Sequence, residues 1–278
     1  MQSLADGLSM REKYPSPFFG KPLLPASALL KDRHRGRRCF IIGNGPSIES
    51  QDLNALAGEV TFVMNGFLHH PVMEAFQPTY YCLGDPCYFD RSESSSRFLD
   101  RLVEAAAGSH FILPYIGASQ MIEERKVPAE RITFVTFGGI LSSSGLPRLD
   151  LTRPIPSITT CAELAMLVAL YAGCSPIYLI GLDHDWLAHR GLYTHFYPQK
   201  TLENHAVAHG DLGKYPYGVV IESTLKVWRG YEAIKGYAGA HGQQIINATR
   251  GGFLDVFERA NLEEIIVQGS HSSTARAA

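Results

Sequence analysis

Two neighbouring segments decide the fold class: ITTCAELAMLVALYAG (158–173) and PIYLIGLD (176–183). The first predicts a helix that is apolar on all sides and therefore deeply buried, with Ser157 or Thr159 as its N-cap and Gly173 after its last turn. The second is β-rich and shows no alternation of polar and apolar residues, which is typical of a central strand in a parallel sheet. A buried helix followed by a buried strand is the unit of α/β folds.

The rest of the chain continues this alternation of strands and helices. Because strands joined through helices pair in parallel, we expect a Rossmann-like α/β fold with a mostly parallel sheet, helices on both faces and a mobile lid segment. Strands are predicted at 38–44, 59–67, 79–85, 110–115, 131–137 and 243–249, and helices at 50–58, 92–107 and 221–242.

Composition predicts one domain. The 278 residues, 45% of them hydrophobic, suffice for a sizeable core. We expect a mostly irregular leader over 1–36 with at most a short helix, a single nucleotide-binding domain over 37–267 with a lid at about 184–218, and a disordered tail over 268–278.

Charge and cysteine content exclude several classes. The formal net charge of −2 gives no basic field for nucleic acid, and the five cysteines are too scattered for a disulfide framework. The sequence has no apolar signal core and no apolar run of 18 residues. We therefore expect a cytoplasmic protein with at most peripheral membrane contact, and homo-oligomer formation remains open.

The first polar cluster is the loop Gly43-Asn44-Gly45-Pro46-Ser47, after the first predicted strand. Glycines let the backbone approach a ligand, and the next helix offers free N–H groups to a phosphate. The spacing matches neither the dinucleotide-binding fingerprint nor a Walker loop. It is either a generic glycine-rich turn or a nucleotide-binding loop in which Asn44 contacts a ribose, a phosphate or a base.

Two further strand ends carry Asn65 and Asp85, each beside glycine or proline. Singly, these are ordinary turn residues. Parallel strands, however, bind ligands at their carboxyl ends. We therefore expect Asn44, Asn65, Asp85 and Asp183 to meet in one crevice.

The densest cluster lies at 181–199 and admits four interpretations: a transition metal on its His and Asp side chains, a divalent cation held by Asp183 or Asp185 together with substrate phosphates, a polar surface loop, or a lid over a nucleotide. A second loop, 203–218, carries His205 and His209 four residues apart, either as a lid with a general base or as a flexible surface loop. The polar and aromatic residues of the cluster at 181–199 are Asp183, His184, Asp185, His189, Tyr193, His195 and Tyr197.

The segments FIIGNGPSI, MNGF and SITTCAELAMLVALYAGCSPIYLIGLDHDW resemble two related groups. One comprises the bacterial sialyltransferases that use CMP-activated sialic acid. The other is the 6-hydroxymethylpterin diphosphokinase-like (MptE-like) domain, to which the HFY and INAT…GGFLDVF features are closer, and which is often found beside surface-polysaccharide functions. The resembling segments cover roughly 40–250 in patches.

The resemblance implies roles for individual residues. Asn44, Gly45, Ser47 and Asn65 would hold the nucleotide. Ser157 and Thr159 would lie near a sugar carboxylate or the phosphates, Asp183 would support the base or ribose, and Tyr193 or Tyr197 would contact the phosphate. His209 or His205 would be the base, with His195 the next candidate. The chain departs from the sialyltransferases at Asp185, which stands where they place a phosphate-binding tyrosine.

Three functions follow from these patterns. The first is a glycosyltransferase that moves a nucleotide-activated sugar, with a CMP-activated nonulosonic acid favoured, to a glycan or lipid acceptor. The second is a Mg²⁺-dependent transfer of diphosphate from ATP to a hydroxymethyl compound, with the metal on Asp183 and Asp185. The third is a nucleotide-sugar binding module without catalysis.

Overall fold

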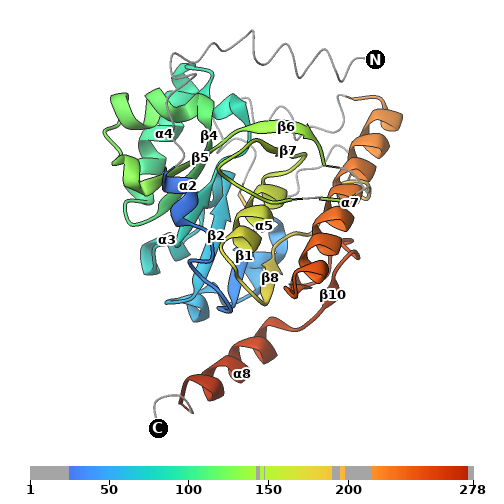
Figure 1. Cartoon of the computed structure of the whole chain (residues 1–278). Helices are drawn as coiled ribbons and strands as arrows, with labels where there is room; N and C mark the ends of the chain where they lie inside the picture. Colours follow the sequence, from blue (N-terminus) through green and yellow to red (C-terminus); the bar gives the residue numbers. More distant parts are fainter. Residues whose placement is uncertain (1–24, 142–144, 147, 190–194, 198–214, 275–278) are drawn as a thin grey trace.

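The protein is an α/β domain built on one parallel sheet (Figure 1). The structure, a computed structural model, describes residues 25–141, 145–146, 148–189, 195–197 and 215–274. The main sheet has eight strands in the order β10-β9-β8-β1-β2-β3-β4-β5, and every neighbouring pair is parallel. The strands are β1 Cys39–Ile42, β2 Val60–Met64, β3 Tyr80–Cys82, β4 His110–Pro114, β5 Ile132–Val135, β8 Ile177–Ile180, β9 Ile245–Asn247 and β10 Glu258–Arg259.

Helices cover both faces of the sheet, as predicted. One face is packed by α5 (Cys161–Tyr171) and α7 (Tyr217–Ala240), and the other by α4 (Glu93–Ala105), the short α3 (Val72–Ala75) and the first turn of α8 (Leu262–Thr274). Each face therefore has its own hydrophobic cluster. The fold class expected from the sequence is confirmed.

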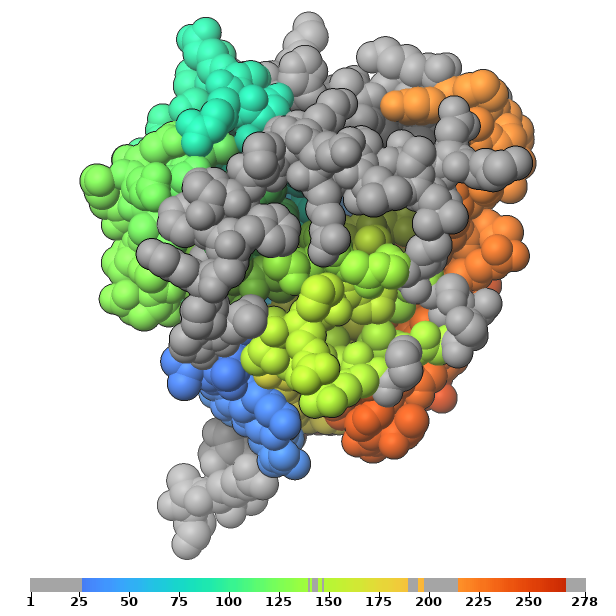
Figure 2. Space-filling model, turned by 45° about the horizontal axis from the view of Figure 1, so that its top comes forward, coloured from blue at the N-terminus to red at the C-terminus, as the bar shows by residue number. Residues whose placement is uncertain are grey.

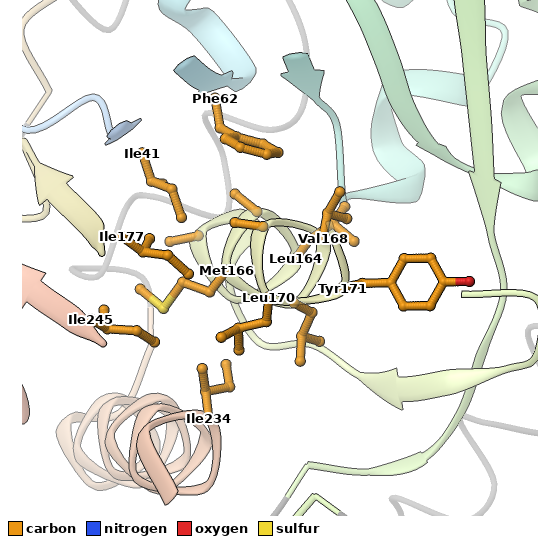
Figure 3. Packing of buried hydrophobic residues seen from close by; sticks show 14 of the residues in the cluster. Ile41, Phe62, Leu164, Met166, Val168, Leu170, Tyr171, Ile177, Ile234 and Ile245 are labelled. Carbon is orange, nitrogen blue, oxygen red and sulfur yellow. The ribbon is translucent and has the colours of Figure 1, made fainter. Parts of the chain in front are cut away.

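Helix α5 is the centre of the larger cluster. Ten of its residues, Ala162 to Tyr171, are buried, because strand residues such as Ile41, Phe62 and Ile177 pack on one side and Ile234 of α7 packs on another (Figure 3). Its N-cap is Thr160, not Ser157 or Thr159 as predicted. The Thr160 side chain accepts the Glu163 N–H while the Glu163 side chain accepts the Thr160 N–H, and this reciprocal capping box fixes the start of the helix.

Several predicted elements differ from the structure. The expected helix at 50–58 is replaced by two 3-10 turns, because Asp52 caps the second turn through the Asn54 N–H and interrupts a continuous helix. The expected strand at 131–137 divides into β5 and β6, and β6 leaves the main sheet to pair in parallel with β7. The elements not yet given are α2 Pro25–Leu29, β6 Phe137–Ile140, β7 Ile155–Ser157, the 3-10 turns η1 Pro46–Ser50, η2 Leu53–Leu56, η3 Asn65–His69, η4 Pro86–Phe89, η5 Tyr115–Gly117 and η7 Ala129–Arg131, and the π-helix η6 Ser119–Glu124.

Both ends of the predicted domain are more ordered than expected. Before residue 37, α2 forms and Leu30 is fully buried, while the N–H groups of Asp32 and His34 donate to the carbonyls of Tyr171 and Ala172 at the end of α5. At the other end, α8 extends to Thr274, into the stretch predicted as a tail from 268. Its start is fixed by Asn261, whose side chain accepts the Glu263 N–H at 2.8 Å.

No helix in the described part of the chain is both long enough and apolar enough to cross a membrane.

Candidate active site

A cavity of about 390 Å³ opens at the carboxyl edge of the sheet. β1 lies between β2 and β8. The strands β2 to β5 lie on one side of β1 and β8 to β10 lie on the other, so the strand order reverses at β1, and such a switch point is where open parallel sheets bind ligands. The N-terminal turns of α7 stand at the margin of the face brought forward in Figure 2.

The structure brings the four predicted strand-end residues together, since Asn44, Asn65, Asp85 and Asp183 all line this cavity. Asp85 also caps η4, where its Oδ1 accepts the Cys87 N–H at 2.9 Å. Other predicted site residues that line the cavity are Gly43, Gly45, Thr159, His184, Asp185 and His195.

Asn44 and Asn65 form one side of the cavity, which we call the amide wall. The Nδ2 of Asn44 donates to the Met64 carbonyl at 3.1 Å, which leaves its buried Oδ1 without a partner in the described structure. Asn65 has a φ of 52°, and its buried Oδ1 likewise has no partner among the described residues. Because buried acceptors are rarely left unpaired, two of them in one cavity indicate a ligand that carries hydroxyl or amino donors.

A second part of the lining, which we call the helix wall, consists of the N-cap Thr160, of Cys161 and Ala162 in the first turn of α5, and of His184. The first N–H groups of a helix have no intrahelical acceptor. The Glu163 N–H is taken by the Thr160 hydroxyl, so the N–H groups of Cys161 and Ala162 remain for a ligand. With the helix dipole behind them, they favour an anion such as a phosphate or carboxylate.

Glu163 supports the helix wall from below. Its Oε2 accepts the N–H groups of Thr159 and Thr160, the latter at 3.0 Å, and its side chain is fully buried. Burial raises the pKa of the carboxyl to about 7, against the opposing effect of these two N–H bonds. Its Oε1 faces Gly230 of α7, where an added Cβ would lie 2.0 Å from that oxygen, so only glycine fits there.

His184 completes the helix wall. Its Nε2 lies 2.6 Å from the Tyr231 hydroxyl, which lies 3.2 Å from the Thr160 hydroxyl. The ring stacks on Trp186 and is nearly parallel to the Tyr231 ring, with centroids 4.4 Å and 5.4 Å away. Burial lowers the pKa of His184 to about 3, so the imidazole is neutral near pH 7.

Asp183 joins the glycine-rich loop to the end of β8. Its Oδ2 accepts the Ser47 hydroxyl at 2.9 Å, and an added Cβ on Gly45 would lie 1.6 Å from that oxygen. Burial raises the pKa of Asp183, the Ser47 hydrogen bond opposes this, and the charge of Asp185 adds to it. The glycine at 45 is therefore required by the carboxylate itself.

Asp183 and Asp185 do not fit a metal site made by the protein alone. The Oδ2 of Asp185 pairs with His189 Nε2 at 2.9 Å, and its buried Oδ1 has no described partner. Nowhere in the described ranges do three His, Cys, Asp or Glu side chains gather as metal ligands.

The segment 195–197 lies over the amide wall. The Phe196 N–H donates to the Asn44 carbonyl at 2.9 Å, and the Tyr197 ring is packed against Gly66 and His195. Burial lowers the pKa of His195 to about 4. Tyr197, predicted to hold a phosphate, is buried and does not line the cavity.

The remaining predicted residues lie elsewhere. Pro46 begins η1, and Ser157 is exposed at the end of β7. Arg250 follows β9, and its position at a strand end would suit a clamp on a phosphate or carboxylate, but it pairs with Glu263 at 2.7 Å and donates to the Ser50 carbonyl. Tyr193, His205 and His209 fall outside the described residues.

Thr160, Glu163, Tyr231 and Trp186 belong to the site but were not predicted for it. The Thr-x-x-Glu spacing at 160–163 was a readable capping signal. Tyr231 carried no local signal, because it lies on α7, 47 residues after His184 in the sequence.

Comparison with known proteins gives structural matches alone: no family model and no curated protein sequence matches the chain. Among solved structures, the sialyltransferase CstII from Campylobacter jejuni with the substrate analogue CMP-3FNeuAc is 13% identical, with a TM-score of 0.47 over 81% of this chain and 86% of that chain. A CST-II complex with a trisaccharide acceptor and CMP is 11% identical, with a TM-score of 0.45 over 80% of this chain and 85% of that chain. These structures belong to one of the two groups that the sequence motifs resemble.

Proposed function

We propose that the chain is a glycosyltransferase that moves a nucleotide-activated sugar, a CMP-activated nonulosonic acid, to a glycan or lipid acceptor. The observation that carries the proposal is the polarity of the cavity. Asn44 and Asn65, whose buried Oδ1 atoms have no partner in the described structure, line the same cavity as Cys161 and Ala162, whose N–H groups stand in the first turn of α5 and have no intrahelical acceptor. A nucleotide offers hydroxyl donors on its ribose and negative charge on its phosphate, which matches both walls.

The chemistry follows from the helix wall. When the bond between sugar and phosphate breaks, negative charge grows on the departing phosphate. N–H groups already aimed at that position stabilise the charge without reorganisation. The carboxylate of a nonulosonic acid is a second anion that this wall can hold. The resemblance of the loop at 43–47 and of the segment at 157–186 to the sialyltransferases supports the same assignment.

The acceptor hydroxyl needs a base. His195 lines the cavity, and its lowered pKa of about 4 keeps the ring in the proton-accepting form near pH 7. His195 is the candidate base among the residues that the structure describes, and His205 and His209 of the predicted lid are the other two candidates. Histidine-to-alanine variants at the three positions, assayed with one donor, identify the base by a loss of roughly 100-fold in the chemical step.

Asp185 keeps the diphosphokinase as a second candidate. Its unpaired Oδ1 lines the cavity together with Asp183, so two carboxylates would be available beside the phosphates of a larger nucleotide.

A nucleotide panel tests these functions. Thermal unfolding is measured with CMP, UMP, AMP, ADP and ATP, and ligand at about 100 times its dissociation constant should stabilise the protein by about 2.7 kcal/mol. Stabilisation by CMP, together with sugar transfer that persists in excess EDTA, supports the glycosyltransferase. Preference for ATP and loss of turnover in EDTA would replace it with the diphosphokinase. Binding of CMP without turnover of any CMP-sugar would leave a binding module.

A further inference from the structure

His184 has a hydrogen-bond arrangement that the proposed function has not yet used. Its Nε2 is bonded to Tyr231 OH at 2.6 Å, while its Nδ1 has no hydrogen bond within the described residues. The residue lines the cavity, so Nδ1 is the ring nitrogen available to a ligand. Which nitrogen carries the proton decides whether His184 offers a donor or an acceptor there.

The neighbours of Tyr231 favour one direction for the hydrogen bonds. The Thr160 hydroxyl already accepts the Glu163 N–H at 3.3 Å, so its own proton is available for the Tyr231 oxygen. Tyr231 then donates its proton to His184 Nε2. The 2.6 Å length agrees, because it suits a hydroxyl donor and is shorter than usual N–H···O bonds.

We infer that His184 is a catalytic residue whose Nδ1–H, fixed by the chain Thr160–Tyr231–His184, donates a hydrogen bond to the phosphate of the bound nucleotide. Tyr231 and Thr160 are positioning residues in this arrangement. The backbone of His184 has a φ of 50° and its ring is held in an aromatic stack, so the donor is set before the ligand arrives. No bond to the protein forms, and the proton stays on Nδ1 throughout. The identity of the receiving group rests on the proposed function.

The first test reads the tautomer directly. NMR spectra of the full chain with ¹⁵N-labelled histidine should show His184 as the Nδ1–H form in the absence of ligand. Tyr231→Phe should lose this form or mix it with the Nε2–H form. Tyr237→Phe, a tyrosine on the same helix outside the cavity, should leave it unchanged. An Nε2–H form in the unaltered protein would overturn the inference whatever nucleotide the protein binds.

The second test separates the phosphate from the rest of the nucleotide. Affinities for CMP and cytidine are measured for His184→Gly, which tolerates the positive φ but lacks the donor, and for His184→Asn, whose side-chain N–H can stand near the position of Nδ1. His184→Gly should weaken CMP binding about 10- to 100-fold with little change for cytidine, and His184→Asn should recover part of the loss. Tyr231→Phe should show the same pattern more weakly.

Two results have distinct meanings. Equal losses for CMP and cytidine in His184→Gly, or no loss for CMP, would refute a donor to the phosphate. If the unaltered protein binds neither ligand, the proposed function fails, and the tautomer measurement still decides the state of His184. Thermal unfolding of each variant shows whether the aromatic stack has survived.

Discussion

The two walls of the cavity are built in opposite ways. The amide wall consists of side chains at two strand ends, and each leaves a buried oxygen unpaired. The helix wall is braced from behind by Glu163 and Tyr231, which satisfy its caps and hold His184. Both walls can therefore gain hydrogen bonds from a ligand, the amide wall through acceptors and the helix wall through donors, but only the helix wall is part of a capped helix that must form before a ligand binds. Variants in the first should change binding alone, and variants in the second should change both binding and folding.

The largest effect is expected where the two walls are joined, at the glycine-rich loop. Gly45→Ala places a Cβ 1.6 Å from Asp183 Oδ2, so the carboxylate and the loop must move apart. We expect CMP affinity to fall roughly 100-fold or more, because displacement of about 1 Å at a site costs that much. Isothermal titration calorimetry with CMP measures this loss of affinity.

Gly236→Ala is the matched control for this change, because an added Cβ there, toward the C-terminal end of α7, meets nothing within 4 Å. It should keep CMP affinity and raise stability by up to about 1 kcal/mol. Unchanged affinity in Gly45→Ala would show that the loop does not hold the nucleotide.

The next effect concerns Glu163 and pH. Its folded-state pKa of about 7 lies above its ordinary value of 4.5, so the native state favours the protonated acid. The stability from this group is fully present below about pH 4.5 and is lost as pH rises through about 7, a change on the order of 3 kcal/mol.

Denaturant unfolding of the unaltered protein and of Glu163→Gln, measured across this range, isolates the effect, because the buried histidines contribute equally to both. The variant should gain stability relative to the unaltered protein as pH rises. A constant difference would mean that the carboxyl does not titrate in this window.

A smaller pair of changes contrasts the walls directly. Asn65→Gly keeps the left-handed backbone and removes an unpaired acceptor, so unfolding of the free protein should change little while CMP affinity falls about tenfold. Thr160→Ala removes the cap of α5 and should cost about 1 kcal/mol of stability even without ligand. Similar losses of free-protein stability in both variants would contradict the distinction between the walls.

The smallest effect is expected outside both walls. Arg250 pairs with Glu263 on the surface, and both side chains are 54% exposed. Arg250→Ala should change stability by less than about 0.5 kcal/mol and leave CMP affinity unchanged. A marked loss of affinity would extend the site beyond the described cavity.

The sequence predicted the amide wall far better than the helix wall. Asn44 and Asn65 stand directly after strands, so a parallel sheet alone brings them to one edge. Thr160 and Glu163 were readable as a capping box, but the helix start was predicted three residues too early because Ser157 and Thr159 are equally good caps in isolation. Tyr231 reaches His184 only through the packing of α7 on α5, a long-range contact that no local pattern encodes.

The fold was predictable for a similar reason. Short apolar runs bounded by polar or turn residues are typical of buried parallel strands, and seven of the eight strands of the main sheet coincide with predicted ones. β10 has two exposed residues and no such run, and α8 is amphipathic only in its first turns. β10 and α8, whose own sequences carry weak signals, were therefore the elements that the sequence analysis did not predict.

The position of β1 between β2 and β8 has a consequence for how the specificity of this site can evolve. The crevice exists because the chain diverges there, and its position does not depend on which side chains fill the loops. Replacing Asn44 or Asn65 by other polar residues would therefore alter what the protein recognises while leaving the recess itself intact, and new donor specificities could arise without a new architecture.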